Sequence, residues 1–297
     1  MRWTIFALAL MAASPAAADP LLHPMFADHA VLQRGQPIPV YGQAHPGAEV
    51  QVQLGDAHVT ARASANGQWR ATLPAMAAGG PYTLQASSGG ESQQISDVLV
   101  GDVFLCTGQS NMQLSVRRAA NADAEITAAT DGAVRELAVD RVASPVTLAS
   151  FSTPVSWKVE SPQTAGDFSA SCFYFARELR KHVRTPIGLV TVAWGGTRDR
   201  GWVSEPSLRA LSFYNDDLDM LALYRRDPNA ASRRWDAAWE SWWHSHAKDE
   251  PWKSDTSSWP VAPQAMGAWN DWPAFHCRKA APNRAWALSG SFGLPPM

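Results

Sequence analysis

Residues 20–98 consist of short hydrophobic runs in which apolar and polar positions partly alternate. Turn-forming residues separate the runs at intervals of about 8–12 residues, a rhythm typical of a β-sandwich. Asn66-Gly67 is a strong local signal for a hairpin loop, and Trp69 is expected in the core. The runs expected to form strands are residues 31–32, 38–40, 50–54, 58–60, 68–73 and 82–86.

Near residue 97 the pattern changes to uninterrupted hydrophobic runs, which are typical of strands buried on both faces. These runs cover residues 98–100, 103–106 and 186–194. Between them, residues 167–183 predict a helix, because apolar side chains recur at helical spacing. Strand, helix and strand in this order predict a parallel α/β sheet. The expected core-facing stripe of the helix is Cys172, Phe175, Ala176, Leu179 and Val183.

After about residue 205 the chain becomes rich in tryptophan. Trp235, Trp239, Trp242 and Trp243 recur at helical spacing, which indicates the buried face of a helix. A sugar-stacking surface is the alternative interpretation of the same four residues. Beyond about Pro273 the sequence shows no sustained period.

The first 18 residues have the features of a secretory signal peptide. Arg2 precedes a short apolar stretch over residues 5–13, and small residues at 16–18 form a cleavage site of the A-x-A kind. An N-terminal helix is the alternative. We therefore expect cleavage after Ala18 and a mature protein that is secreted or periplasmic.

Composition narrows the classes of partner. The 297 residues carry 25 basic and 27 acidic side chains without a basic block, which argues against nucleic acid as the main partner. No apolar run of about 18 residues follows the N-terminus, so we expect no membrane span. Metal-ligand spacings such as C-x-x-C or H-E-x-x-H do not occur, and we expect no metal. Cys106, Cys172 and Cys277 are an odd number of cysteines, and we interpret them as buried free thiols.

Ser110 is the strongest candidate for a nucleophile. It follows a buried strand and Gly108 and opens a stretch that is compatible with a helix, so its backbone N–H would point outward where negative charge is favoured. Gly195-Gly196 ends a second buried strand. Because carboxyl ends of parallel strands meet at one sheet edge, we expect both turns to lie together and a glycine N–H to serve as a second oxyanion donor. An N-cap serine and an ordinary loop turn are the alternatives.

Two blocks of sequence around these residues resemble a known family. The run from Gly101 to Met112, with its Gly-Gln-Ser-Asn-Met core, closely resembles the nucleophile block of the sialate O-acetylesterase family, within the SGNH hydrolase superfamily. The run from Gly188 to Thr197 resembles the second block of that family. The β-rich start also resembles the family's N-terminal sandwich, so the resemblance covers roughly residues 20–210.

The resemblance implies an activity and a set of roles. An enzyme of this family removes O-acetyl groups from a sugar such as sialic acid, with Ser110 attacking the acetyl carbonyl and the N–H groups of Ser110 and of Gly195 or Gly196 holding the oxyanion. Gln109, Asn111 and Trp202 would contact the acetylated sugar. No metal or organic cofactor is implied. Acetylesterase action on another glycan such as xylan, or a non-catalytic carbohydrate-binding protein, are the alternatives.

The sequence also departs from the family pattern. Arg198-Asp199-Arg200-Gly201-Trp202 stands where the family has an Ile-Glu-x-Trp-like run, and neither the Gln-Gly-Glu-Ser-Asn run nor the catalytic Asp-x-x-His occurs. None of the eight histidines has that spacing. His244 and His246 are expected to be solvated, and Asp102 to be structural. Whether the chain is an active enzyme is therefore uncertain, and we expect the 297 residues alone to be nearly inactive.

Pattern and resemblance together give a domain organisation. We expect an α/β protein with an N-terminal β-sandwich, the first part of a parallel-sheet SGNH-hydrolase-like domain, and the start of an inserted domain. The expected boundaries are 1–18 for the signal peptide, 19–97 for the sandwich, 98–205 for the first half of the α/β domain and 206–297 for a Trp-rich segment that starts the inserted domain, with its truncation left open.

Overall fold

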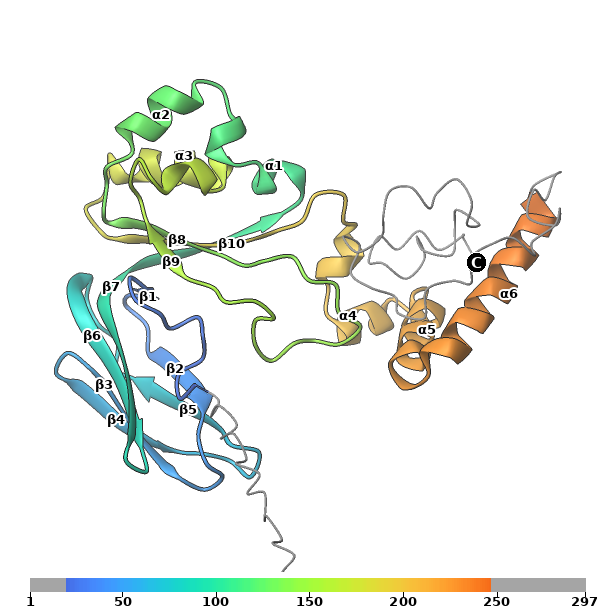
Figure 1. Ribbon diagram of the computed structural model, residues 1–297, viewed down its shortest axis with the longest axis horizontal. Helices are drawn as coiled ribbons and strands as arrows, with labels where there is room; N and C mark the ends of the chain where they lie inside the picture. The colour runs from blue at the N-terminus through green and yellow to red at the C-terminus, as the bar shows by residue number, and fades with distance from the viewer. Residues whose placement is uncertain (1–19, 247–297) are drawn as a thin grey trace, which may run out of the picture.

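The computed structural model describes residues 20–246. These residues form one large mixed sheet, a small two-stranded sheet and two groups of helices (Figure 1). The strands are β1 (Val31–Gln33), β2 (Ile38–Gln43), β3 (Glu49–Leu54), β4 (Ala57–Arg62), β5 (Gln68–Leu73), β6 (Gly79–Ser88), β7 (Glu91–Gly108), β8 (Val134–Ala138), β9 (Trp157–Val159) and β10 (Ile187–Ala193). The α-helices are α1 (Ser110–Gln113), α2 (Ala122–Ala128), α3 (Ala170–Arg180), α4 (Glu205–Ala210), α5 (Asn215–Arg226) and α6 (Pro228–His246), and 3-10 turns lie at Val116–Arg118, Ala165–Asp167 and Asp199–Trp202.

β7 is the strand that joins the two halves of the molecule. It pairs antiparallel with β6 through its first half and parallel with β10 through residues 102–108. The sheet order is β4-β3-β6-β7-β10-β8-β9, and β1 also pairs with β7. The two hydrophobic runs at 98–100 and 103–106 thus belong to one strand, and the sequence boundary at residues 97 and 98 lies within it.

In the sandwich part, which consists of β1–β6 and the first half of β7, buried and exposed side chains alternate along the strands, as expected for strands with one buried face. β3 and β5 bury every second residue, and β2 pairs with β5 to form the small sheet. All six strands expected before residue 90 are present. One expectation is wrong: Gly67 makes a tight turn, but β4 and β5 on either side pair with strands of different sheets and form no hairpin. β4 and β5 lie in different sheets because each strand packs its apolar side chains against the other sheet.

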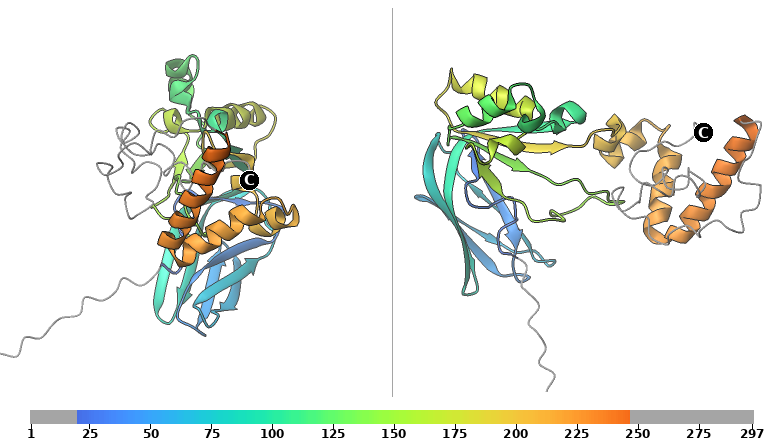
Figure 2. Two further views of the ribbon diagram at one scale, coloured as in Figure 1. Left: turned by 90° about the vertical axis from the view of Figure 1, so that its right-hand side faces the viewer. Right: turned by 45° about the horizontal axis from the view of Figure 1, so that its top comes forward.

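The parallel part has a helical layer on one face. β7, β10 and β8 run parallel, β9 is antiparallel at the edge, and α1, α2 and α3 gather on one side of these strands (Figures 1 and 2). The other face packs on the sandwich core, to which Leu137 and Trp157 belong. Gly188 permits this contact, because a Cβ there would lie 2.7 Å from the Val31 Cβ. The parallel sheet is confirmed, and β8 and β9 are strands that the sequence pattern did not reveal.

The predicted helix at 167–183 is present as α3 but is three residues shorter at each end, and Ser169 caps it by accepting from the Cys172 N–H. Its predicted stripe is partly wrong. Cys172 and Ala176 are buried, but Phe175 is 45% exposed and packs edge-on against Phe104, while Phe173 is buried instead. The reason is a second buried face: Phe173 packs in a cluster with Ile126 and Ala129 from the segment around α2, separate from the cluster that contains Cys172 and Ala176.

Cys106 and Cys172 form a disulfide between β7 and α3. The expectation of free thiols is therefore wrong for these two residues, because strand and helix place their side chains opposite each other in the same layer. Cys277 lies outside the described residues. The bond closes a long loop, because 66 positions separate the two cysteines in sequence.

Helices α4, α5 and α6 form a separate group beside the end of β10 (Figure 2). Trp235 is buried against Met220 and Ala231, and Trp239 packs on the same cluster, so the expected buried helix face is confirmed for these two tryptophans. The side chains of Trp242 and Trp243 lie outside the described part. Among residues 20–246, no helix is both long and apolar enough to cross a membrane.

Candidate active site

Ser110 lies at a sharp turn between strand and helix. β7 ends at Gly108, whose φ of 148° is a conformation suited to glycine, and α1 begins at Ser110 itself. Gln109 is the N-cap residue and makes no capping hydrogen bond through its side chain. Ser110 is exposed, and its hydroxyl makes no hydrogen bond within residues 20–246. The N-cap alternative for this serine is therefore wrong, and the hydroxyl is accessible.

The Gly195-Gly196 turn lies against this serine, as predicted. β10 and β7 are parallel partners that end in register at Ala193 and Gly108, and the Trp194 N–H donates to the Gly108 carbonyl at 3.0 Å. A Cβ at Gly195 would lie 3.4 Å from the Ser110 Cβ. Glycine thus lets the second backbone approach the serine side chain closely.

The two glycines differ in what their N–H groups do. The Gly195 N–H donates to Gln113 Oε1 at 2.6 Å, so a side chain of α1 already occupies it. Gly196 has a φ of 84° and exposed surroundings, and its N–H makes no hydrogen bond within the described part of the chain. Gly196 is therefore the glycine whose N–H is available to a ligand. Gln113, one turn after Ser110, is a site residue that the sequence analysis missed.

Thr197 links the other expected site residues. The Gln109 side-chain amide donates to the Thr197 carbonyl, and the Trp202 indole Nε1 donates to Thr197 Oγ1 at 3.0 Å. The backbone carbonyl of Asn111 accepts a hydrogen bond from Ser171 Oγ at 3.1 Å. Gln109 and Trp202 thus hold the glycine turn in place, whereas the Asn111 side chain remains exposed at the surface.

A polar network fastens α1 to α3. Ser169 Oγ donates to the Met112 carbonyl at 2.6 Å, and the Ala170 N–H donates to the Leu114 carbonyl at 2.7 Å. Buried Glu136 on β8 accepts from the Ser169 N–H at 3.0 Å and from Thr191 Oγ1 at 2.5 Å. Burial raises the pKa of the Glu136 carboxyl, and the two hydrogen bonds oppose that shift. Glu136 could not be recognised from spacing, because its partners lie on other elements.

No histidine side chain within the described residues hydrogen-bonds to Ser110. His23, His29, His45 and His58 belong to the sandwich part. His182 follows the C-terminal end of α3, about 16 Å along that 11-residue helix from the end that contacts α1. Asp102 accepts a two-point ion pair from Arg34, which confirms its structural role.

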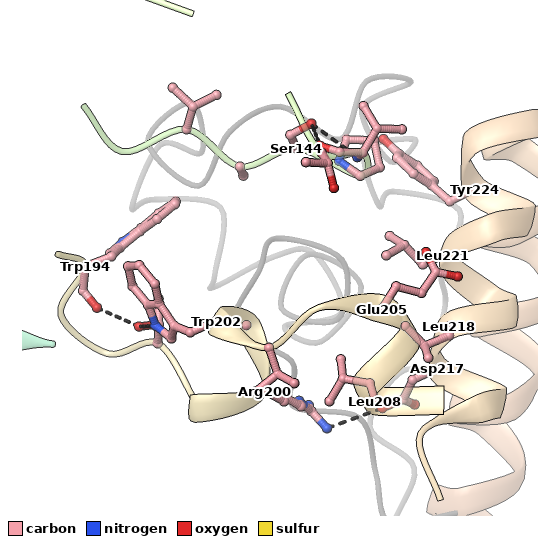
Figure 3. Close-up of a pocket in the computed structure, with 18 of the residues that line it drawn as sticks. Ser144, Trp194, Arg200, Trp202, Glu205, Leu208, Asp217, Leu218, Leu221 and Tyr224 are labelled. Atoms are coloured by element: carbon pink, nitrogen blue, oxygen red, sulfur yellow. Dashed lines mark hydrogen bonds and ion pairs between the residues drawn. The ribbon is translucent and has the colours of Figure 1, made fainter. Parts of the chain in front are cut away.

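A cavity of about 490 Å³ opens beside the glycine turn (Figure 3). Trp194 and Trp202 line one side of it, and Leu218, Leu221 and Tyr224 of α5 face them across the opening. Thr197 and residues 139–147 also line the cavity. Trp194 directly precedes Gly195, so the Cα atoms of the two residues lie about 3.8 Å apart. The wall of the cavity therefore begins at the residue next to Gly195, which contacts Ser110.

The described residues contain no group of three or more His, Cys, Asp or Glu side chains placed to hold a metal ion. The chemistry available at the turn is that of an exposed hydroxyl, a free backbone N–H and a neighbouring cavity.

Comparison with known proteins agrees with this geometry. Residues 100–227 match the family described as carbohydrate esterase, sialic acid-specific acetylesterase. Human sialate O-acetylesterase is 33% identical over 188 residues, which cover 58% of this chain and 36% of the human protein. The mouse sialate O-acetylesterase is 34% identical over 196 residues, again 36% of its length.

A solved structure gives the same picture. The carbohydrate acetylesterase of Xanthomonas citri superposes with a TM-score of 0.62 at 40% identity, covering 64% of this chain and 44% of that one. The chain thus spans about a third of the length of its curated relatives. The matched residues include both turns of the site, and this part of the chain, residues 100–227, matches the sialic acid-specific acetylesterase family of carbohydrate esterases.

Proposed function

We propose that the turn at Ser110 removes O-acetyl groups from a sugar by nucleophilic catalysis. The observation that carries this proposal is the close approach of an exposed serine and a glycine turn that leaves one backbone N–H free. Acyl transfer needs this pair of features: a hydroxyl that can reach a carbonyl carbon, and donors for the oxygen that becomes negative.

The proposed reaction has two steps. Ser110 Oγ forms a bond to the acetyl carbonyl carbon while its proton goes to a base, and the carbonyl π electrons move to the oxygen. Collapse of this intermediate breaks the bond to the sugar oxygen, which leaves as a hydroxyl after taking a proton. Water then attacks the acetyl-serine in the same way and releases acetate and free Ser110.

The Ser110 and Gly196 N–H groups are the proposed oxyanion donors. Gly195 takes this role only if Gln113 releases its N–H. Helix α1 is a single turn of four residues, so its dipole contributes little and the N–H groups themselves matter. Gln109 and Trp202 are proposed to orient the sugar by holding Thr197, and Asn111 to contact it from the surface.

No histidine side chain within the described residues hydrogen-bonds to Ser110, so none of them is proposed as the base. We therefore propose that the 297-residue chain alone hydrolyses acetyl esters slowly. Loss of triad members in serine proteases leaves about 10³–10⁴-fold over the uncatalysed rate. Full activity requires a histidine or another base from outside the described part.

Export is proposed on two grounds. The signal-peptide features of residues 1–18 are one. The Cys106–Cys172 disulfide supports the same conclusion, because such bonds persist in oxidising compartments and are rare in the cytosol. No cofactor enters the proposed reaction, and the proposed partner is an acetylated sugar, sialic acid or another glycan.

Chemical rescue tests the proposal. Purified chain is incubated with an acetylated oligosaccharide, with and without free imidazole, beside Ser110→Ala and the matched surface variant Ser92→Ala. We expect slow acetate release that imidazole accelerates at least tenfold, in the unmodified chain and in Ser92→Ala but not in Ser110→Ala. The absence of any Ser110-dependent release with imidazole would favour the alternative of a non-catalytic sugar-binding protein.

A second variant distinguishes the two glycines. In Gln113→Ala the Gly195 N–H loses its acceptor, whereas in Gln113→Glu a carboxylate oxygen can still accept it. If Gly196 is the donor, Gln113→Ala slows rescued hydrolysis by loosening the turn, and Gln113→Glu stays within about threefold of the unmodified chain. Faster hydrolysis in Gln113→Ala would instead assign the donor role to Gly195.

A further inference from the structure

We propose that Ser171 is a positioning residue for Ser110, the proposed nucleophile. This inference rests on the proposed function, since it concerns the same serine and the same reaction. Ser171 lies in the first turn of α3, and its hydroxyl donates to the backbone of Asn111, the residue that follows Ser110. Two observations carry the inference: α1 is too short to keep its own orientation, and the start of α3 holds its carbonyl groups.

Helix α1 depends on its surroundings for its orientation. It has four residues, whereas isolated helices shorter than about 12–15 residues are marginal in water. Its single turn is closed by two backbone hydrogen bonds of 2.9 Å, from the Gln113 N–H to the Gln109 carbonyl and from the Leu114 N–H to the Ser110 carbonyl. The direction in which the Ser110 hydroxyl and N–H point is therefore set by the contacts that α1 makes with other elements.

Three consecutive residues at the start of α3 hold the open end of α1. The last carbonyl groups of a helix have no partner within the helix and need donors from elsewhere. Donors from α3 and its N-cap meet this need for α1 and its C-cap residue. The pairs are Ser171 Oγ with the Asn111 carbonyl at 3.1 Å, Ser169 Oγ with the Met112 carbonyl at 2.6 Å, and the Ala170 N–H with the Leu114 carbonyl at 2.7 Å. Because hydrogen bonds are directional, these contacts together orient α1 on α3.

Ser171 differs from its two neighbours in what else it does. Ser169 is also the N-cap of α3 and donates its N–H to buried Glu136, and the Ala170 donor is a backbone group. Ser171 is exposed, and its hydroxyl contacts the residue next to Ser110. Removal of this hydroxyl therefore weakens the support of α1 and leaves both the cap of α3 and the buried core in place.

Helix α3 is covalently tied to the strand that leads into Ser110. Cys172, which directly follows Ser171, forms the disulfide with Cys106 of β7. The first turn of α3 therefore cannot move freely relative to β7. Ser171 thus connects α1 to a fixed base, which is what a residue that orients a nucleophile requires.

The kinetic effect of this residue should fall on kcat. The Ser110 hydroxyl must be aligned with the acetyl carbonyl carbon, and the Ser110 N–H must lie within hydrogen-bond distance of the developing oxyanion. Loss of an interaction that serves the transition state lowers kcat and kcat/KM equally, whereas loss of a contact to the bound sugar raises KM. A merely structural role for Ser171 would produce neither pattern.

Imidazole-rescued hydrolysis of an acetylated oligosaccharide by the full 297-residue chain tests the proposal. We expect Ser171→Ala to lower kcat at least about fivefold and to leave KM within about twofold. Ser171→Thr keeps a hydroxyl, and its kcat should recover to within about twofold of the unmodified chain. Ser88→Ala is the matched control, because it removes a hydroxyl that donates to the Glu49 carbonyl in the sandwich, and its kcat should be unchanged. An unchanged kcat in Ser171→Ala, or an equal loss in Ser88→Ala, would overturn the proposal.

Hydrogen exchange measures the support of α1 without any turnover. The Gln113 and Leu114 amides close the turn of α1, so the peptide that contains them should exchange at least about threefold faster in Ser171→Ala. The same peptide should be unchanged in Ser171→Thr and Ser88→Ala. Exchange of peptides from β3 should be equal in all four proteins, which separates a local loss of order from a loss of the fold. Equal exchange of the α1 peptide in Ser171→Ala and the unmodified chain would contradict the proposal.

The two measurements distinguish this proposal from the proposed function. Faster exchange in Ser171→Ala without any Ser110-dependent acetate release would refute the esterase and leave the support of α1 by Ser171 intact. Ser110-dependent release with the same kcat in Ser171→Ala and the unmodified chain would refute the positioning role and leave the esterase intact.

Discussion

The sandwich around β3, β5 and β6 and the layer that carries Ser110 are stabilised in different ways. The sandwich has a large apolar core in which residues such as Leu54, Leu73 and Leu84 are completely buried. The Ser110 layer has a small apolar cluster under α3. It relies on a disulfide and on hydrogen bonds in which Glu136 and Gln113 accept and Ser169 donates. The first arrangement is non-directional, whereas the second sets the positions of individual backbone groups.

This difference matters for function. Burial of apolar area tolerates small shifts, since its free energy depends on area and not on angle. An oxyanion donor must instead lie within hydrogen-bond distance of one oxygen. The Ser110 layer therefore uses directional contacts where the chemistry needs them, and it obtains less of its stability from hydrophobic burial.

The largest effect should come from the sandwich core. Leu84→Ala removes a fully buried side chain, and we expect a loss of about 3–5 kcal/mol in the free energy of unfolding. Thr83→Ala, on the exposed face of the same strand, should change it by less than about 0.5 kcal/mol. Urea unfolding followed by circular dichroism measures both. Similar small losses in both variants would show that this core is not what stabilises the sandwich.

The disulfide should be the largest contribution within the Ser110 layer. For cysteines 66 positions apart, the chain-entropy model gives about 4 kcal/mol. The double variant Cys106→Ala/Cys172→Ala should lose this amount and become insensitive to dithiothreitol, while the unmodified chain is destabilised by the reductant. Free thiols at both positions, detected by alkylation and mass spectrometry of the oxidised protein, would contradict the pairing.

We expect Glu160 to make the stability of this layer depend on pH. Burial raises its pKa from 4.5 to about 7, although the Asp131 N–H donates to its carboxylate. Between pH 4.5 and 7 the folded state therefore binds more protons than the unfolded state, and stability falls as pH rises through that window. The full shift corresponds to about 3 kcal/mol.

Glu160→Gln checks this dependence, because the amide is similar in shape and does not titrate. Urea unfolding is measured at pH 5 and at pH 8. From pH 5 to pH 8 the unmodified chain should lose about 2.5 kcal/mol more of its free energy of unfolding than the variant does. Equal losses in the two proteins would assign the pH dependence to other groups.

The smallest effect concerns the anchor of α1. Glu136→Leu leaves the Ser169 N–H and the Thr191 hydroxyl without their acceptor, and we expect a loss of about 2 kcal/mol. Glu136→Gln keeps an oxygen that can accept both, and it should lose less than about 1 kcal/mol. If both variants equal the unmodified chain in thermal and urea unfolding, the network contributes nothing to the layer.

The same contrast explains what could be predicted from the sequence. The sandwich strands follow from hydrophobic periodicity, because burial of one face imposes that period. The strands at 98–106 and 187–193 follow from uninterrupted hydrophobic runs, but the expected burial on both faces is wrong at Leu105, which is 67% exposed. The turn at Ser110 and its proximity to Gly195 follow from two parallel strands ending in small residues. Both were predicted correctly.

The missed features depend on contacts between distant elements. The disulfide, the Glu136 network and the occupation of the Gly195 N–H by Gln113 join residues that are far apart in sequence. Phe173 replaced Phe175 in the core because a second layer covers α3. The Asn66-Gly67 hairpin failed because tertiary packing separated its strands. No local pattern contains this information.

The central claim is that Ser110 attacks the acetyl group, and covalent trapping tests it most directly. The chain is mixed with an acetylated oligosaccharide and imidazole, quenched in acid within seconds, digested and analysed by mass spectrometry. The account predicts an acetyl group on the peptide that contains Ser110, present also in Ser92→Ala and absent in Ser110→Ala. Acetate release without acetylation of Ser110, or equal acetylation of other exposed serines, would contradict it.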